Sequence, residues 1–367
     1  MNVFYQPTDE HIAVLDQSWN AAYSGGKDST SLVTWVEWLR RSKRIVADNP
    51  ILLRSNTTIE DCMLDDITRE MESVLRASGW TCIEVTPAIH EKMFNRILGI
   101  GNAPIHPGGR TMRWCTRATK IDPMERYRKQ NEVNGLTLTG LRFGESDIRD
   151  EKLLKTGCVA GGECGIPPKS ERTYSPIVTW KTCNVMDWLN GAVDWWQVRR
   201  FMDDIHATTR KLVKIYNVRI GQRGLADWND PEVSMARFGC IGCPAICAGR
   251  EAPNSVVRRY GADHPLTELY DVWYEARRMD NRCIRRKAEG RRRKGGKDVR
   301  GPIRMAVRKV LFERVMDIQR RAGVVLVTPE DEAFIRQCWA EQRYPRGWSA
   351  ADELTKSTEL TLLPFNE

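Results

Sequence analysis

The hexapeptide SGGKDS, residues Ser24–Ser29, combines the residue types that bind a phosphate group in a tight turn. Gly25 and Gly26 allow successive backbone N–H groups to face one anion, Lys27 adds a positive charge, and the two serines add hydroxyl donors. The residues before this segment predict a strand and those after it predict a helix, whose N-terminus carries the positive end of the helix dipole. The spacing differs from that of the P-loop and of the dinucleotide-binding motif. We call Ser24–Ser29 the phosphate loop.

A second group of residues has the spacing of metal ligands. Cys240, Cys243 and Cys247 form the pattern C-x-x-C-x-x-x-C. Two thiolates at C-x-x-C spacing hold one metal from a tight turn, and the third comes within reach one turn later. A tetrahedral zinc site and a cubane iron–sulfur cluster both need a fourth ligand, and the spacing does not choose between them. We interpret the isolated cysteines as packing residues: Cys62, Cys82, Cys183, Cys283 and Cys338.

The net charge of +9 belongs to one segment, Arg285–Lys309, which we call the basic tract. The basic tract holds twelve Lys or Arg residues against two acids, so the rest of the chain carries 45 basic and 46 acidic residues. A polyanion such as nucleic acid is the natural partner of such a segment, because binding releases counterions from the phosphates. A solvated, glycine-rich loop is the alternative interpretation.

The elements that would position these residues alternate along the first half of the chain. Strands are predicted at 20–23, 51–58, 81–87 and 136–142, and helices at 29–41, 61–77 and up to about 130 with Pro123 in the first turn. Strands separated by helix-length segments predict a doubly wound parallel sheet, which is an α/β fold. From Asn184 onward the chain is expected to be mainly helical. We therefore expect two domains, residues 1–183 and 184–367.

Composition limits the classes of protein. Of the 367 residues, 41% are hydrophobic and 29% charged, which excludes a fully disordered or fibrous chain. No apolar run approaches the ~18 residues that a membrane-spanning helix needs, so we expect no membrane association. The N-terminus has no secretory pattern, and eleven cysteines then suggest the reducing cytoplasm.

At this point the residues show a resemblance. SGGKDS resembles the PP-loop of N-type ATP pyrophosphatases, specifically in the phosphoadenosine-phosphosulfate reductase branch. Four further segments are similar to elements of that branch and follow in the same order: CTRATKIDPMERY (115–127), GLRFGESDIR (140–149), YSPIVTWKTCNVMDWL (174–189) and RFGCIGCP (237–244). The third departs from its pattern at Ser175 and Asn184. Within the branch, the Cys-rich C-terminal half and the basic tract most resemble DNA phosphorothioation proteins of the DndC and SspD type.

The resemblance implies a Rossmann-like, adenine nucleotide alpha hydrolase-like fold that binds ATP and Mg²⁺ at the phosphate loop. It implies that Lys27 and Lys120 contact phosphate oxygens, and that Arg142 and Arg149 contact the α-phosphate or an incoming phosphodiester. Asp28 joins the loop residues in this site, and Glu145 orients one arginine. The alternative for Arg142, Glu145 and Arg149 is a salt-bridged helix entry.

The resemblance also implies a 4Fe-4S cluster and an activity. Related reductases carry a Cys pair where this chain has the single Cys115, which is therefore our candidate for the fourth ligand beside Cys240, Cys243 and Cys247. Cys158 and Cys164 are the rivals, and could instead carry a persulfide. The implied activity is ATP-dependent activation of a DNA backbone phosphate for sulfur insertion, with a cysteine desulfurase and other DNA phosphorothioation proteins as partners.

Three alternatives remain open. A phosphoadenosine-phosphosulfate or adenosine-phosphosulfate reductase would carry a nucleophilic Cys in a C-terminal tail, whereas this chain has no Cys after Cys338. A tRNA thiolation enzyme fits the basic tract as well as a DNA enzyme does. A DNA-binding subunit with a degenerate nucleotide site would not need an intact SGGKDS.

Overall fold

The structure is a computed structural model of the 367-residue chain. It describes residues 5–104, 114–133, 135–144, 173–191, 196–220, 240–241, 260–261, 263–278, 284–286 and 300–350. The chain forms two compact units. Unit 1 comprises Met1–Asn56, Glu60–Thr86 and Asp122–Gly239, and unit 2 comprises Thr57–Ile59, Pro87–Ile121 and Cys240–Glu367.

Unit 1 is built on a five-stranded sheet. Its strands are β1 (Trp19–Tyr23), β2 (Ile51–Ser55), β3 (Thr81–Val85), β4 (Leu136–Leu138) and β5 (Thr173–Tyr174). The spatial order is β3-β2-β1-β4-β5, and every neighbouring pair is parallel. The predicted α/β fold with a parallel sheet is confirmed.

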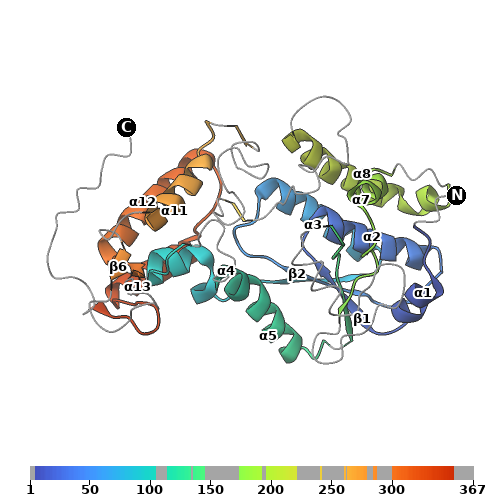
Figure 1. The fold of residues 1–367 in the computed structure, drawn as a ribbon, viewed down its shortest axis with the longest axis horizontal. Helices are drawn as coiled ribbons and strands as arrows, with labels where there is room; N and C mark the ends of the chain where they lie inside the picture. The colour runs from blue at the N-terminus through green and yellow to red at the C-terminus, as the bar shows by residue number, and fades with distance from the viewer. Residues whose placement is uncertain are drawn as a thin grey trace. The chain divides into compact units, whose positions relative to one another are not determined.

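The order of the strands explains where the helices lie. The chain moves outward from β1 to β3 through α2 (Lys27–Arg41) and α3 (Cys62–Ala77), and then returns past β1 to β4 through α5 (Asp122–Gln130). Because crossovers between parallel strands are right-handed, reversing the direction places α5 on the opposite face of the sheet from α2 and α3. Figure 1 shows this arrangement. The sheet is therefore doubly wound, and its direction reverses between β1 and β4.

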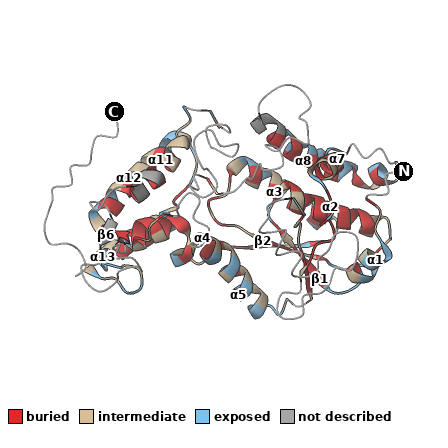
Figure 2. Ribbon diagram, in the orientation of Figure 1, coloured by how far each residue is buried: buried red, intermediate tan, exposed pale blue. Residues whose placement is uncertain are grey.

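Helix α2 is the centre of the core of unit 1. Twelve of its fifteen residues are buried, and Figure 2 shows most of its ribbon in the colour of buried residues. Helices α7 (Thr182–Asn190) and α8 (Trp196–Ile220) pack on it, and the indole of Trp188 donates to the hydroxyl of Thr34 over 2.9 Å. Tyr5, Trp35 and Trp180 complete an aromatic cluster around these helices. Since α7 and α8 belong to this core, unit 1 extends beyond residue 183. The domain boundary expected between residues 183 and 184 stays a prediction.

Unit 2 is mainly helical. Its described elements are η2 (Ile89–Glu91), η3 (Asn95–Ile100), α4 (Trp114–Thr116), η4 (Arg117–Ile121), α11 (Thr267–Arg278), α12 (Met305–Ala322) and α13 (Pro329–Ala340), with an antiparallel pair of strands, β6 (Ile284–Arg286) and β7 (Arg300–Ile303). The N-terminus of α13 is held by Asp331, which accepts from Lys92 and Asn95 near η3. The guanidinium of Arg308, fully buried in α12, donates to the carbonyls of Gly99 and Ile303. These bonds tie the C-terminal helices to η3.

Several predicted boundaries were wrong. The residues before the first predicted strand contain a helix that was not predicted, α1 (Asp9–Leu15), which Thr8 caps. The predicted strand 136–142 ends at Leu138. After Leu138 the chain turns toward the phosphate loop, where Arg142 donates to Asp28. The strand predicted at 51–58 ends at Ser55.

Part of the basic tract lies outside the described residues, and its described parts fall in β6, β7 and the start of α12. Among the described helices, none combines the length and apolar character that crossing a membrane requires.

Candidate functional site

The phosphate loop lies at the point where the sheet changes direction. It follows β1 directly, and the segment after β4 lies beside it, so the carboxyl ends of two adjacent strands meet there. A Cβ atom on Gly140 would lie 2.8 Å from the backbone of both Asp28 and Ser29, which shows how closely the two segments approach. In open α/β sheets, ligands bind at this kind of crevice.

Gly25 and Gly26 let the chain turn from the strand into the helix in very little space. Gly25 has φ +71°, a conformation that side chains rarely adopt, and a Cβ atom there would lie 2.0 Å from Oγ1 of Thr68 on α3. Gly26 is the N-cap of α2, and no side chain caps the helix at this residue. The first turn of α2 therefore presents backbone N–H groups without the capping side chain that usually satisfies one of them.

The two serines close the phosphate loop on itself. The Ser29 hydroxyl accepts from the backbone N–H of Ser24 over 3.2 Å, lies 3.0 Å from the Ser24 hydroxyl, and donates to the carbonyl of Gly26 over 3.1 Å. Ser24 is exposed, whereas Ser29 is buried. Ser29 thus fixes the shape of the phosphate loop, and Ser24 is the hydroxyl that faces solvent.

Lys27, Asp28 and Arg142 form a charged cluster at the N-terminus of α2. The Lys27 ammonium donates to Oδ2 of Asp28 over 3.0 Å, and Nε of Arg142 donates to Oδ1 over 2.7 Å. The second guanidinium nitrogen of Arg142 donates to the carbonyl of Trp180 over 2.8 Å. Lys27 and Arg142 are only 4% and 3% exposed, so these cations are held in place rather than moving in solvent.

Charge controls the ionisation of Asp28. Burial by itself would raise the pKa of this carboxyl group, but the charges and hydrogen bonds of Lys27 and Arg142 together hold the pKa below its ordinary value. The cluster therefore contains two cations and one carboxylate, with a net charge of +1. A positive charge at an uncapped helix N-terminus favours an anion such as phosphate.

Sequence reasoning missed two groups that hold this cluster. The hydroxyl of Tyr216 on α8 accepts the backbone N–H of Lys27 over 3.1 Å, and the ring of Tyr216 lies 5.6 Å from the Lys27 ammonium. Trp180 contributes through its backbone carbonyl. Nothing in the sequence signals either contact, because the two residues lie 189 and 38 positions from their partners.

The described cysteines of the predicted metal site lie in unit 2. Cys240 is held by neighbours in the segment 57–59: its sulfur lies 3.7 Å from the Thr57 hydroxyl, and the N–H of Ile241 donates to the carbonyl of Ile59 over 2.8 Å. Cys115 lies in α4. Burial raises the pKa of its thiol and the nearby Cys240 raises it further, whereas Thr116 and the positive charge of Lys120 lower it. The structure thus brings Cys115, Cys240 and Lys120 into one neighbourhood.

The remaining predicted site residues lie outside the described residues: Cys243, Cys247, Cys158, Cys164, Glu145 and Arg149. Within the described part of the chain, no three Cys, His, Asp or Glu side chains are arranged to hold a metal ion. The chemistry of the two thiols of Cys115 and Cys240 fits a soft metal such as the iron of a cluster. A cluster needs four ligands, and these two cysteines are two of the four predicted ones.

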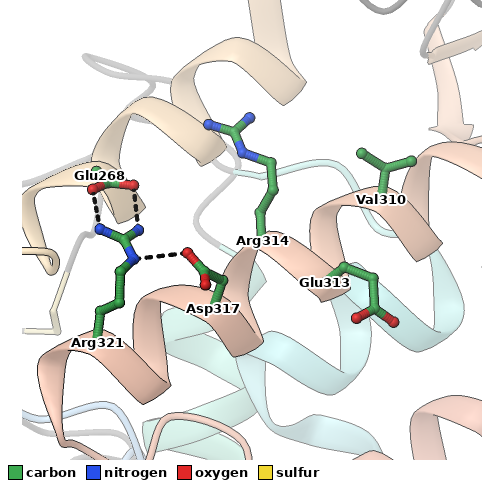
Figure 3. Close-up of a pocket in the computed structure, with 6 residues that line it drawn as sticks. All are labelled: Glu268, Val310, Glu313, Arg314, Asp317 and Arg321. Atoms are coloured by element: carbon green, nitrogen blue, oxygen red, sulfur yellow. Dashed lines mark hydrogen bonds and ion pairs between the residues drawn. The ribbon is translucent and has the colours of Figure 1, made fainter.

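A separate pocket of about 410 Å³ lies on α11 and α12 of unit 2 (Figure 3). Arg321 crosses between the two helices and donates to both oxygens of Glu268 over 2.7 Å and to Asp317 over 2.7 Å. No residue of this pocket was a predicted site residue. Its charged groups link α11 to α12.

No family model matches the chain, and no curated protein matches it. Two of the solved structures that are similar to it are enzymes. One is phosphoadenylyl-sulfate (PAPS) reductase from Candida auris in a phosphate complex, with 12% identity and a TM-score of 0.32 over 51% of this chain and 88% of that chain. The other is the U34-tRNA thiolase NcsA from Methanococcus maripaludis with its 4Fe-4S cluster, with 12% identity and a TM-score of 0.34 over 67% of this chain and 85% of that chain. Because both TM-scores are below 0.5, these similarities carry no argument about the activity of this chain.

Proposed function

We propose that this protein is an ATP pyrophosphatase that activates a DNA backbone phosphate for sulfur insertion. The observation that carries the proposal is the cluster of Lys27 and Arg142 at the uncapped N-terminus of α2, where the sheet reverses direction. This cluster supplies buried cations and helix amides for a polyphosphate. The sulfur and DNA steps rest on the motif resemblance, the cysteines and the basic tract.

The phosphate loop binds the β- and γ-phosphates of ATP. Lys27 exchanges its bond to Asp28 for a phosphate oxygen, while Arg142 stays on Asp28 and directs positive charge toward the α-phosphate. Before ATP binds, both carboxylate oxygens of Asp28 accept from cations, so we expect Mg²⁺ to arrive bound to the phosphates of ATP. Fixed positive charge of this kind stabilises a transferring phosphoryl group without reorganisation.

The reaction proceeds in two displacements. A non-bridging oxygen of the DNA phosphodiester attacks the α-phosphorus of ATP, a new P–O bond forms, and pyrophosphate leaves. A sulfur nucleophile then attacks the DNA phosphorus, and AMP leaves with the oxygen. Hydrosulfide enters without any net oxidation or reduction, whereas a persulfide from a cysteine desulfurase also needs two electrons from a thiol to release its carrier. Adenylation makes the second step feasible because AMP is a much better leaving group than oxide.

The cysteines of unit 2 would supply the sulfur side of the reaction. Cys115 and Cys240 would hold a 4Fe-4S cluster together with Cys243 and Cys247. When bound, such a cluster would supply Lewis-acidic iron that keeps sulfur deprotonated and nucleophilic. Burial raises the pKa of the Cys115 thiol, and the positive charge of Lys120 offsets part of this rise.

DNA would bind through the basic tract, which accounts for the net positive charge of the chain. Contacts of this kind go to the phosphate backbone and weaken steeply with salt. We propose a cysteine desulfurase and other DNA phosphorothioation proteins as partners, and a cytoplasmic setting.

The test measures pyrophosphate release from ATP with DNA, with tRNA or with neither. We expect release to depend on DNA and to disappear in Lys27→Ala, while the matched variant Lys129→Ala, an exposed lysine on α5, keeps it. Mass spectrometry of DNA from cells with and without the gene should then show a sulfur-for-oxygen shift in dinucleotides. Release that depends on tRNA, with altered tRNA nucleosides and unmodified DNA, would instead identify a tRNA thiolation enzyme. Thiol-dependent sulfite release from phosphoadenosine phosphosulfate would identify a reductase.

A further inference from the structure

Tyr216 contacts both the backbone and the side chain of Lys27. Its hydroxyl accepts the backbone N–H of Lys27 over 3.1 Å, and its ring lies 5.6 Å from the ammonium group. Tyr216 itself is 2% exposed. The N–H in question is the first of α2, next to the N-cap Gly26, which has no side chain to cap the helix. Tyr216 thus satisfies the first amide of α2 from α8, whereas a side chain at the N-cap would satisfy the second or third amide.

The position of Tyr216 is set by the alignment of two helices. At the C-terminus of α2, Arg41 donates to the Phe201 carbonyl over 2.6 Å and to Asp204 over 2.7 Å and 2.9 Å. At the N-terminus of α2, Lys27 meets Tyr216. The helices therefore run antiparallel, and the two contacts are separated by about 21 Å along α2 and about 18 Å along α8. The ion pair at one end fixes the register that brings Tyr216 to the phosphate loop at the other.

A third contact holds α8 close to the phosphate loop. Glu70 on α3 accepts from the hydroxyl of Thr208 over 2.8 Å and from the ammonium of Lys211 over 2.7 Å. Because α3 also carries Thr68, which Gly25 contacts, the phosphate loop is enclosed by α3 and α8 together. These contacts fix the backbone of α8 beside the phosphate loop.

We propose that Tyr216 is the positioning residue for Lys27. Its hydroxyl fixes the first amide of α2, and its ring holds the ammonium group where it can move from Asp28 to a phosphate oxygen. A cation within about 6 Å of an aromatic ring is attracted to the ring face. The inference rests on the proposed function, since it gives Lys27 a phosphate to bind.

Two variants separate the two contacts. Tyr216→Phe removes the hydroxyl and keeps the ring, whereas Tyr216→Leu removes both. The matched control is Tyr5→Phe, another buried tyrosine, whose hydroxyl donates to the Asn184 carbonyl over 3.1 Å. The first readout needs no nucleotide: in Tyr216→Phe, hydrogen exchange of the Lys27 amide should become about two- to tenfold faster, as expected for a lost hydrogen bond. Tyr5→Phe should leave this amide unchanged.

The second readout is the binding of inorganic pyrophosphate, measured by calorimetry. Tyr216→Leu should bind it about two- to fivefold more weakly than Tyr216→Phe, which is the expected effect of the ring on the ammonium. On a Lys27→Ala background this difference should vanish, because no ammonium remains to be positioned. A residue with a merely structural role would give the same difference on both backgrounds.

The outcomes distinguish the inference from the proposed function. Tighter pyrophosphate binding by Tyr216→Phe would mean that the hydroxyl competes with phosphate, and it would overturn the inference. Two other results would also overturn it. One is a difference in pyrophosphate affinity between Tyr216→Leu and Tyr216→Phe that persists on the Lys27→Ala background, and the other is an unchanged exchange rate of the Lys27 amide in Tyr216→Phe. A wild-type protein that binds neither pyrophosphate nor ATP would overturn the proposed function, and with it the role of Tyr216 toward phosphate, even if the exchange result confirmed the contact.

Discussion

Replacing Gly25 with alanine would put a methyl group where the structure has no room. The backbone there has φ +71°, which disfavours any L side chain by about 1 kcal/mol. The new Cβ atom would also lie 2.0 Å from Oγ1 of Thr68, a buried hydroxyl that donates to the Leu64 carbonyl over 2.7 Å. Relieving this overlap must shift α3 or the phosphate loop, which typically costs about 1–3 kcal/mol. We therefore expect Gly25→Ala to lower the free energy of unfolding by about 2–4 kcal/mol, measured by urea denaturation.

Gly144 provides the matched control in the same unit. Its φ is +80°, but a Cβ atom there would meet nothing within 4 Å, so Gly144→Ala should show the backbone penalty alone. The double variant Gly25→Ala, Thr68→Ala should recover at least about 1 kcal/mol relative to the sum of its single variants, because the clashing oxygen is gone. Equal losses for Gly25→Ala and Gly144→Ala, or additive behaviour with Thr68→Ala, would refute the close approach of the phosphate loop to α3.

Three further predictions concern charge and metal. Lys27→Ala should reduce pyrophosphate release by at least about a hundredfold without changing iron absorbance, and retained release would remove Lys27 from the site. Asp28→Asn should lower the free energy of unfolding at pH 7 by about 3 kcal/mol, because it leaves Arg142 and Lys27 without their carboxylate. The pKa of Asp28 is depressed in the folded protein, so its ionised carboxylate stabilises the fold above the ordinary pKa of about 3.9, and this stabilisation is lost as the pH falls through the folded pKa. Below about pH 4, the urea midpoint of Asp28→Asn should therefore fall less with decreasing pH than the midpoint of the wild type. Parallel curves of midpoint against pH would contradict this prediction. Cys115→Ser should bind less iron after anaerobic purification than Cys62→Ser, and equal iron contents would exclude Cys115 as a ligand.

The alternation of strands and helices was sufficient to predict the parallel sheet and the position of the phosphate loop. Long elements such as α2 and α3 carry many apolar residues at regular spacing, and local signals such as Asp61, which caps α3, mark their ends. The strands β5, β6 and β7 have two to four residues each, too few to show any alternation. Their pairing is decided by distant contacts, so the sequence did not predict them.

The candidate site shows the same difference between local and long-range information. Residue types and spacing predicted Lys27 as a phosphate ligand, and the motif resemblance added Asp28 and Arg142, because both kinds of signal are local. The structure adds that Asp28 holds both cations and that Tyr216 holds Lys27. These partnerships depend on how α8 and the segment after β4 pack against α2. The pattern of neighbouring residues in the sequence does not show which distant segments pack against α2.

Cys115 and Cys240 are a case in which a resemblance suggested a pairing that spacing alone left open. The structure places Cys240 close enough to Cys115 to raise the pKa of the Cys115 thiol. The identity of the bound group, the other ligands and the DNA substrate stay predictions.

The most direct test of the account is a crystal structure of the protein with ATP. We predict that the β- and γ-phosphates lie against the first turn of α2, with Lys27 moved from Asp28 to a phosphate oxygen and Arg142 near the α-phosphate. Nucleotide bound at another place, with the Lys27–Asp28 bond of the phosphate loop unchanged, would contradict the account.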